Sequence, residues 1–472
     1  MKKIKIGLLP FWIKLYDDVC GNVRPSVEAF YKTIVKEYEK RGITVFTAPV
    51  CRLKNEFNQA IKRFEEDEVD AIVTLHLAYS PSLESSEILA RTFLPLIVLD
   101  TTPDFAFDCT QKGEAIMGNH GIHGVQDMCN LLIRNGKKFL IEAGHWKESD
   151  VIDRTVQDCI AVRLVKNMQH SRVGIIGKPF AGMGDFAVDF AILKKTIGMD
   201  VIESVPADFA NVELDTEDRI IAEDNKKYNS VDLCDVVHRR SIKVYLQIKK
   251  WLVVKKLDAF TFNFLDLDHS GLETAPFYAA CKAMAEGIGY AGEGDVLTAA
   301  FVGAFISEFP ETTFTEMFCP NWKDNSIFMS HMGEIGLNVC DGKVALLEKE
   351  FIYGKAENPA YFAGRMKPGK AALLNLAPGP ENRFSLIAVP VEIGDSKGAV
   401  NMKGSIAGWF KPSMDLPEFL QEYSLHGGTH HSALVYNCNL DIIKNFARLM
   451  GWKFKLISNN ETETPREFSK LH

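Results

Sequence analysis

The chain has 472 residues, of which 46% are hydrophobic and 25% are charged, and its formal net charge is -8. This length exceeds what one hydrophobic core supports, so we expect two or three domains. The acidic balance argues against nucleic acid or an anionic membrane as a partner, because binding to polyanions needs clustered lysine and arginine. No apolar run approaches the roughly 18 residues of a membrane span. Lysines interrupt the apolar start of the chain, which predicts a strand there rather than a secretory signal.

The first two-thirds of the sequence alternates short apolar, β-rich runs with longer amphipathic stretches. The runs predict strands within 3–11, 43–50, 70–78, 95–102, 138–145, 172–180, 200–208 and 258–266. The stretches between them predict helices over 24–41, 53–67, 122–135, 150–169, 185–196, 236–255 and 277–288. Continuous apolar strands separated by helices indicate parallel sheets covered on both faces. Ligands of such sheets bind at the carboxyl ends of the strands, so polar residues just after each run are candidates for function.

The pattern changes after about residue 311, where strands follow one another with few helices between them. The expected strands fall within 312–319, 325–331, 343–354, 370–379, 383–394 and 404–412, before a last helix over 439–450 and a strand within 453–458. This pattern predicts an antiparallel barrel or sandwich. We therefore predict two doubly wound α/β domains, 1–169 and 170–311, followed by a mainly antiparallel, barrel-like β domain, 312–472.

The ten cysteines occur singly, beginning with Cys20, Cys51 and Cys109, and no C-x-x-C pair is present. This spacing favours reduced thiols over a disulfide framework or a thiolate zinc site. We therefore expect a cytoplasmic protein.

The stretch GYAGEGDVLTAAFVGAF, residues 289–305, combines a glycine-flanked carboxylate with a predicted helix. Asp295 suits the N-cap of that helix. Gly292 and Gly294 leave Glu293 on a tight turn at the helix N-terminus, where the helix dipole favours an anion. A charged turn ahead of a helix explains these residues equally well, but the two glycines also permit close approach of a ligand.

The stretch TFTEMF, residues 313–318, places a carboxylate among aromatic residues. In a strand, Glu316 shares a face with Phe314 and Phe318, so either the carboxylate is buried or two phenylalanines are exposed. A buried carboxylate needs a metal, hydrogen bonds or a cation such as a core arginine. His331 follows in FMSHMGE, in a strand expected to neighbour the first, where a histidine can also be an ordinary core residue.

The segment HGGTHH, residues 426–431, adds His430 and His431 beside two glycines. Two carboxylates and one or two imidazoles on turns or apolar strands predict a mononuclear metal site. Oxygen and nitrogen donors without a thiolate suit Mn²⁺, Co²⁺ or Mg²⁺ better than structural zinc.

Polar clusters also follow predicted strands in the amino-terminal half. They comprise His76, Asp100, His120 and His123 in GNHGIHG, and GHW at 144–146. A ligand pocket and simple turn or cap hydrogen bonds explain them equally well. The loop GKPFAGMGDF, residues 177–186, lacks both G-x-G-x-x-G and the G-K-[ST] ending, so the sequence argues against a nucleotide site there.

Taken in order, these motifs resemble those of the L-arabinose isomerases, within the wider group of L-fucose and L-arabinose isomerase-like proteins. The resemblance spans essentially the whole chain, through LHLAYSP, NHGIHG, GHW, AGEGD, TFTEMF, SHM, GKAENPA and GGTHH. Its most specific pieces are AGEGD and GGTHH.

The resemblance implies a three-domain homohexamer with active sites at subunit contacts, which converts aldoses to ketoses with a divalent metal, usually Mn²⁺. The metal ligands implied by the matching motifs are Glu293, Glu316, His331 and His431, and the two glutamates would also be the acid/base pair. His430 would lie on the substrate side. His123 would reach the sugar from a neighbouring subunit.

Two departures from the family pattern concern groups that would face the sugar. Ile13 and Lys14 in WIKLY stand where the family has glutamine and histidine, and His120 replaces a family glutamine. The expected substrate is therefore a free pentose, hexose or deoxysugar rather than L-arabinose specifically. A metal-dependent sugar epimerase or lyase, or a non-catalytic sugar-binding protein, remains an alternative on the same scaffold.

Overall fold

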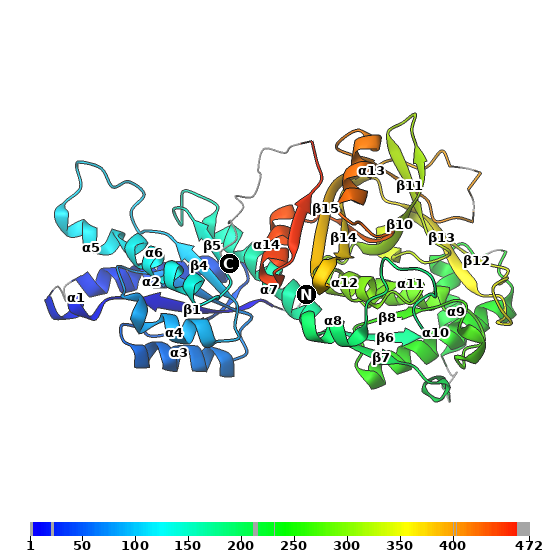
Figure 1. Cartoon of the computed structure of the whole chain (residues 1–472), viewed down its shortest axis with the longest axis horizontal. Coiled ribbons are helices and arrows are strands. Elements are labelled where there is room, and N and C mark those ends of the chain that lie inside the picture. Colours follow the sequence, from blue (N-terminus) through cyan, green and yellow to red (C-terminus); the bar gives the residue numbers. More distant parts are fainter. Residues whose placement is uncertain are drawn as a thin grey trace. The chain divides into compact units, whose positions relative to one another are not determined.

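A computed structural model describes residues 3–19, 23–210, 216–230, 232–399, 401–402 and 404–459; Cys20 lies outside these ranges. The chain forms two compact units (Figure 1). The first comprises Met1–Arg163 and Lys444–Leu449, and the second Leu164–Ile443 and Met450–His472. No helix in the described ranges is long and apolar enough to cross a membrane. The finer division into three domains stays a prediction.

The first unit contains a five-stranded parallel sheet in the order β2-β1-β3-β4-β5. Its strands are β1 Lys5–Phe11, β2 Thr44–Thr47, β3 Ala71–His76, β4 Leu96–Asp100 and β5 Phe139–Ala143. Its helices are α1 Lys14–Val19, α2 Arg24–Lys40, α3 Lys54–Glu66, α4 Ser86–Arg91, α5 Ile116–Asn119 and α6 Gly121–Arg134; α7 Val151–Gln169 runs on into the second unit. The strand order reverses between β1 and β3, which is the place where ligands of doubly wound sheets bind.

Two apolar clusters pack on opposite faces of this sheet. Successive residues of β1 alternate between them: Leu8 belongs to one cluster, with Ile34 of α2, and Leu9 to the other, with Phe57 of α3. Because helices cover both faces, nearly every residue of the three central strands β1, β3 and β4 is buried, which explains their continuous apolar runs in the sequence.

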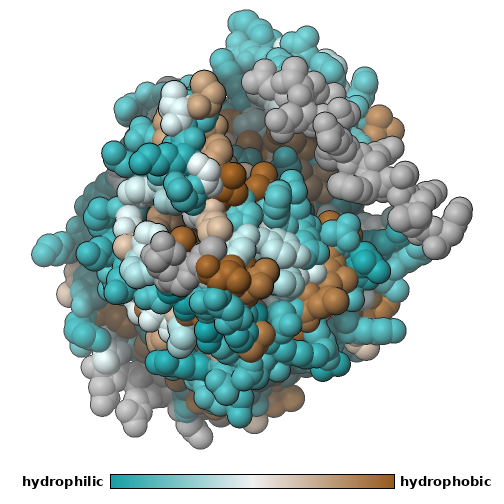
Figure 2. Space-filling model, turned by 90° about the vertical axis from the view of Figure 1, so that its left-hand side faces the viewer, coloured by the Kyte–Doolittle hydropathy of each residue, from teal (hydrophilic) through white to brown (hydrophobic). Residues whose placement is uncertain are grey.

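Several large apolar side chains of the first unit are nevertheless exposed. They include Leu15 and Val19 of α1, Phe105 and Phe107 between β4 and α5, and Ile116 of α5. Figure 2 shows hydrophobic groups scattered among hydrophilic ones on this side of the molecule.

The second unit begins with a four-stranded parallel sheet in the order β7-β6-β8-β9. Its strands are β6 Arg172–Ile176, β7 Asp200–Glu203, β8 Ala259–Phe262 and β9 Gly289–Ala291. The helices of this part are α8 Phe190–Thr196, α9 Glu217–Lys227, α10 Asp235–Lys255, α11 Phe277–Ala285 and α12 Val296–Ile306. Every described residue of α12 except Gly303 is buried, so this helix lies in the core of the unit.

A closed six-stranded antiparallel barrel follows, in the order β14-β17-β10-β11-β16-β15, and β15 pairs back with β14. The strands are β10 Thr312–Asn321, β11 Ser326–Ser330, β14 Gly369–Pro378, β15 Phe384–Ile393, β16 Gly408–Pro412 and β17 His431–Tyr436. The strand β18 Lys453–Leu456 adds to β15 in parallel, and β12 Cys340–Glu348 forms a separate hairpin with β13 Ala360–Met366. The last helices are α13 Leu416–Leu425 and α14 Leu440–Met450. The predicted α/β and barrel architecture is thus confirmed.

The sequence placed some elements wrongly. The helix expected over 185–196 begins only at Phe190, because the Asp189 side chain accepts hydrogen bonds from the amides of Ala191 and Ile192 and caps it there. The strand expected within 343–354 ends at Glu348. The elements that the sequence did not predict are the helices α1, α4, α5, α9 and α13 and the strands β9, β13 and β17.

Candidate metal centre

Three neighbouring strands of the barrel place an imidazole, a carboxylate and a second imidazole side by side. In the antiparallel pairing of β10 with β17, Glu316 lies opposite His431, and in its pairing with β11 it lies opposite Ser330. His331 follows Ser330 at once. Because directly opposite residues lie next to each other across a sheet, the register brings the side chains of these strands into one cluster.

Burial settles the question raised by the alternation around Glu316. Phe314 is 1% exposed and Glu316 9%, so the carboxylate faces the interior. Phe318 is 46% exposed because the register of β10 shifts between Met317 and Cys319. This β-bulge breaks the two-residue alternation and turns Phe318 away from the interior.

The turn between β9 and α12 carries Glu293. Glu293 itself has a φ of +61°, in the left-handed region, and Gly294 follows at +81°. Thr261 of β8 holds the turn, since its hydroxyl accepts from the amide of Gly294 and donates to the carbonyl of Gly292. A β-carbon on Gly292 would lie 2.7 Å from Cε1 of His331, so a glycine is required at this close approach.

Asp295 links this turn to the barrel. One of its carboxylate oxygens accepts from the amide of Thr298 at 2.9 Å, which confirms the predicted N-cap of α12. The other lies 2.9 Å from Nδ1 of His431. Both the Asp295 and the His431 side chain are fully buried.

The two glutamates converge on the same imidazole nitrogen. Nε2 of His431 lies 2.9 Å from Oε1 of Glu316 and 3.5 Å from Oε2 of Glu293. Nε2 of His331 lies 3.1 Å from the same Oε1 of Glu316, and Nε2 of His430 lies 3.5 Å from Oε2 of Glu293. The structure therefore brings all five predicted cluster residues together.

Each histidine of the cluster makes a hydrogen bond through its Nδ1 atom to a carboxylate outside the cluster. The pairs are His431 with Asp295 at 2.9 Å, His331 with Glu334 at 2.7 Å and His430 with Asp185 at 2.6 Å. Such an acceptor fixes the ring so that Nε2 points into the cluster, an arrangement typical of histidines that bind metals. Phe314 contacts the rings of both His331 and His431 edge-on and closes the apolar side of the site.

The electrostatics of the cluster favour charged side chains despite their burial. Burial raises the pKa of Glu293 and of Glu316, but the facing histidines outweigh it, so that the pKa of Glu293 falls to about 2 and that of Glu316 falls below its ordinary range. Burial disfavours protonation of His331, yet Glu334 and Glu316 raise its pKa to about 10. The pKa of His431 is likewise raised, by Asp295 and the two glutamates, against the effect of burial.

The donor set fits a divalent cation. One oxygen or nitrogen atom from each of Glu293, Glu316, His430 and His431 lies within 4.8 Å of the others. Oε2 of Glu293 and Nε2 of His431 are buried, and although Nε2 lies 2.9 Å from Oε1 of Glu316, neither atom makes a hydrogen bond of good geometry with a described residue. A carboxylate oxygen and the lone pair of a neutral imidazole nitrogen, both buried beside a second carboxylate, are electron-pair donors that a bound cation would satisfy. His331, the fourth predicted ligand, meets the group through Glu316.

Sequence reasoning missed three residues that shape the centre. Asp185 contacts His430, Phe186 stacks on His431 with ring centroids 4.9 Å apart, and Glu334 holds His331. Glu334 carried a local signal, since it lies three residues from a candidate histidine. Asp185 and Phe186 belong to the 177–186 loop, which follows β6 and could have been flagged as a strand end.

The other predicted substrate residues belong to the first unit. The structure describes Ile13 and Lys14 at the start of α1, where Lys14 pairs with Asp18 at 2.9 Å. His120 precedes α6, and its Nε2 lies 3.0 Å from the hydroxyl of Tyr16; His123 is exposed in the first turn of α6. Their role toward a sugar stays a prediction.

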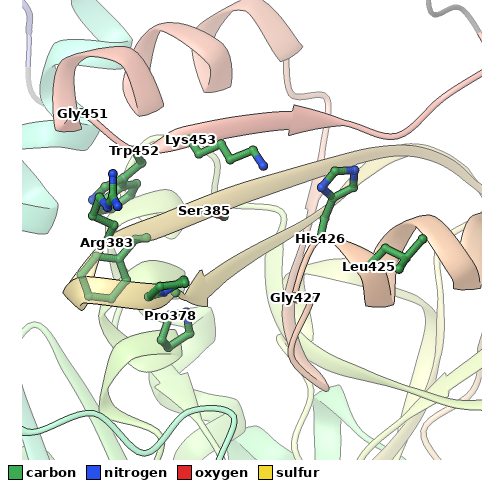
Figure 3. A pocket seen from close by; sticks show the side chains of 12 residues that line it. Pro378, Arg383, Ser385, Leu425, His426, Gly427, Gly451, Trp452 and Lys453 are labelled. Atoms are coloured by element: carbon green, nitrogen blue, oxygen red, sulfur yellow. The ribbon is translucent and has the colours of Figure 1, made fainter. Parts of the chain in front are cut away.

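A separate pocket in the second unit involves His426, the first histidine of HGGTHH. It has a volume of about 640 Å³ and lies between the β14–β15 hairpin, the end of α13 and the start of β18 (Figure 3). Its basic lining residues are Arg383, His426 and Lys453. His426 pairs with Glu422 at 3.3 Å and takes no part in the cluster around Glu293.

The sequence matches two models of one protein family. The L-arabinose isomerase central domain matches residues 199–307, and the L-arabinose isomerase C-terminal domain matches 311–453. L-arabinose isomerase of Mannheimia succiniciproducens is 25% identical over 427 residues, which cover 86% of this chain and 85% of that protein. The enzyme of the same name from Anoxybacillus flavithermus is 22% identical and covers 93% of this chain and 91% of its own. A solved periplasmic sugar-binding protein of Legionella pneumophila is similar at a TM-score of 0.18 and 9% identity, too weakly to bear on function.

These matches, on an α/β and barrel scaffold with paired carboxylates at its centre, define the chain as an isomerase of sugars. Within that class, the chain belongs to the L-arabinose isomerase family.

Proposed function

We propose that the protein is a metal-dependent aldose–ketose isomerase acting on a free pentose, hexose or deoxysugar of the L-arabinose, L-fucose or D-galactose type. The observation that carries the proposal is the convergence of Glu293 and Glu316 on Nε2 of His431. A protein that only bound sugars would have no need of two ionised carboxylates that both lie next to Nε2 of His431.

Glu293, Glu316, His331 and His431 would hold the ion, for which we propose Mn²⁺, with Co²⁺ or Mg²⁺ as substitutes. Hard carboxylate oxygens and imidazole nitrogens without a thiolate suit these ions. When bound, the ion supplies a Lewis acid that polarises the sugar oxygens.

The two glutamates would move the proton that isomerisation transfers between C1 and C2 of the sugar. Both carboxylates are ionised near neutral pH and so can accept a proton, although a lowered pKa makes each a weaker base than a free glutamate. One removes the proton on C2 while O1 gains a proton, which gives the enediol; O2 then loses its proton and C1 gains one, which gives the ketose. A positioned acid–base group typically contributes about 10²–10⁴-fold in rate. A hydride shift from C2 to C1 is the competing route.

We also propose that the protein works in the cytoplasm as a homo-oligomer, a hexamer by family resemblance, in which His123 reaches the sugar of a neighbouring subunit and His120, Ile13 and Lys14 face a sugar. The free state of the described cysteines supports a reducing compartment. The exposed apolar side chains of α1 and α5 support a covered surface on the first unit. Light scattering of the purified protein tests the assembly, and a monomer would contradict it.

The function is tested with purified protein, Mn²⁺ and a panel of pentoses, hexoses and deoxysugars, with products identified by NMR. We expect ketose from at least one aldose, loss of the reaction with EDTA, and a fall in kcat of about 10²-fold or more in Glu316→Gln. Full activity of that variant would contradict the assignment. Solvent deuterium in the product supports the enediol, and its complete absence favours the hydride shift.

The same product analysis tests the alternatives. An epimerase would give a second aldose, and a lyase would give two shorter fragments. A non-catalytic binder would give no product while still binding sugar in calorimetry.

A further inference from the structure

We propose that Asp185 is a positioning residue that fixes the ring of His430, so that Nε2 of His430 binds a sugar hydroxyl beside Glu293. This inference rests on the proposed function and assigns a role to the 177–186 loop, which the sequence left without one. Asp185 does not itself touch the reacting atoms; it acts through His430.

Hydrogen bonds and a ring contact hold the loop that carries Asp185 next to the metal centre. The amide of Phe180 donates to the carbonyl of Glu293 at 2.9 Å, and the amide of Lys178 donates to Asp266 at 2.8 Å. Phe186 is 4% exposed and stacks on His431 at an interplanar angle of 8°. The loop is therefore packed against the turn that carries Glu293 and against His431.

Asp185 contacts two nitrogen atoms of His430, one in the backbone and one in the ring. Its Oδ2 accepts from the backbone amide of His430 at 3.0 Å and lies 2.6 Å from Nδ1 of the ring. A carboxylate on Nδ1 requires that this nitrogen carry the hydrogen. Nε2 is thereby left as the atom turned toward Glu293, whose Oε2 lies 3.5 Å away.

Exposure distinguishes this pair from the two similar pairs. The side chains of His431 and His331 are 0% and 3% exposed, whereas that of His430 is 37% exposed and that of Asp185 36%. The buried pairs suit a permanent ligand sphere. His430 is the exposed histidine of the cluster, so its ring is accessible to a sugar that arrives from solvent.

The test compares Asp185→Ala and Asp185→Asn with a matched control, Asp189→Ala. Asp189 caps α8 four residues further along and donates nothing to the cluster, so its variant reports disturbance of the loop end alone. We expect Asp185→Ala to raise KM about 10- to 100-fold with a smaller change in kcat, because the His430 ring loses the acceptor that orients it and with it the hydrogen bond to the sugar. Asp185→Asn, which keeps an acceptor oxygen, should restore most of the loss, and the control should stay near wild type.

Two measurements independent of turnover complete the test. Mn²⁺ binding, followed by calorimetry, should change less than about threefold in Asp185→Ala. NMR of metal-free, ¹⁵N-histidine-labelled protein should show the His430 ring signals shifted in Asp185→Ala and unshifted in Asp189→Ala. His430→Asn assigns the signals, and His426→Asn serves as the matched histidine control.

The proposal is overturned if Asp185→Ala weakens Mn²⁺ binding as strongly as it raises KM, since His430 would then be a metal ligand. It is also overturned if Asp189→Ala raises KM equally or if the ring signals of His430 do not move. If the wild-type protein isomerises no sugar, the proposed function fails separately, while the NMR comparison still decides whether Asp185 fixes the ring.

Discussion

At the scale of single residues, the centre depends on backbone that tolerates no side chain. A β-carbon on Gly294 would lie 2.6 Å from Cα of Pro179 and 2.8 Å from the carbonyl oxygen of Lys178, both backbone atoms that cannot yield cheaply. The positive φ of Gly294 adds strain for any other residue. The conformation of the Glu293 turn therefore depends on the missing side chain of Gly294 as well as on hydrogen bonds.

We predict that Gly294→Ala lowers the free energy of unfolding by roughly 2–4 kcal/mol, the sum of left-handed strain and a backbone clash. Mn²⁺ affinity should fall with it, because the clash displaces Glu293. Denaturant unfolding and calorimetry measure the two effects. Gly287→Ala is the matched control: Gly287 has a φ of +89°, but its β-carbon would meet nothing within 4 Å. Equal losses in the two variants would show that strain alone, without the clash, accounts for the effect.

The sequence predicted those residues of the centre that their local sequence marks, and it missed those whose partners lie far away in the chain. Glu316 and His331 were predicted because each stands out in a predicted strand, as a charged or titratable group among apolar neighbours, whereas His431 was flagged by the two glycines of HGGTHH and given its ligand role by the family resemblance. Asp185 was missed because its partner His430 is 245 positions away, and nothing local marks a surface aspartate as that partner. Phe318 was ambiguous because a bulge, which no simple alternation reveals, decides which way it faces.

At the scale of elements, the helix α6 rests directly on the end of strand β3. A β-carbon on Gly121 would lie 2.5 Å from the carbonyl oxygen of His76, and one on Gly124 would lie 2.4 Å from its ring. Gly121 and Gly124, two of the three glycines of GNHGIHG, thus allow close packing, which neither of the two sequence interpretations of that motif anticipated. The His76 ring stacks on Phe11 at 4.3 Å, and neither ring nitrogen has a hydrogen-bond partner in the described ranges.

This packing predicts an acid-sensitive contact in the first unit. Burial lowers the pKa of His76 to about 3, with Asp127 opposing weakly. The folded chain thus keeps the ring neutral, whereas the unfolded chain binds a proton below about pH 6.5. Stability should therefore fall as pH drops from about 6.5 toward 3, by up to about 1.4 kcal/mol per pH unit.

Hydrogen exchange of the β3 amides, corrected for intrinsic rates, measures this dependence. In His76→Leu the fall between pH 7 and pH 5 should shrink, because no group titrates at that position. The exposed His123, replaced by Asn, should leave the fall unchanged. A slope that persists in His76→Leu would assign the acid sensitivity to other groups.

Element prediction failed where tertiary contacts override local pattern. Residues 185–189 have helical periodicity, yet Asp185 and Phe186 are drawn to His430 and His431, and the helix starts after its cap at Asp189. The buried parallel strands were predicted well because both of their faces are covered, which forces apolar residues at every position.

At the scale of the whole molecule, the cluster joins the parallel sheet of the second unit to its barrel. Glu293 and Asp295 come from the turn after β9, whereas Glu316 and His431 come from β10 and β17. Without an ion, the glutamates and histidines satisfy one another only in part, since two of their buried atoms lack partners. A bound cation would therefore stabilise the second unit beyond the contacts that the side chains make alone.

We predict that Mn²⁺ at 100 times its Kd stabilises the second unit by about 2.7 kcal/mol, the value expected for a ligand that binds only the folded state. Hydrogen exchange should slow most in peptides that span 289–296, 312–317 and 430–434, and least in those that span 71–77 of the first unit. The double variant Glu293→Gln, Glu316→Gln should show no such slowing, because its amides bind a divalent cation far more weakly than carboxylates do. Equal slowing in that variant would place the ion elsewhere, and the carboxylate pair would then lose its proposed role as metal ligand.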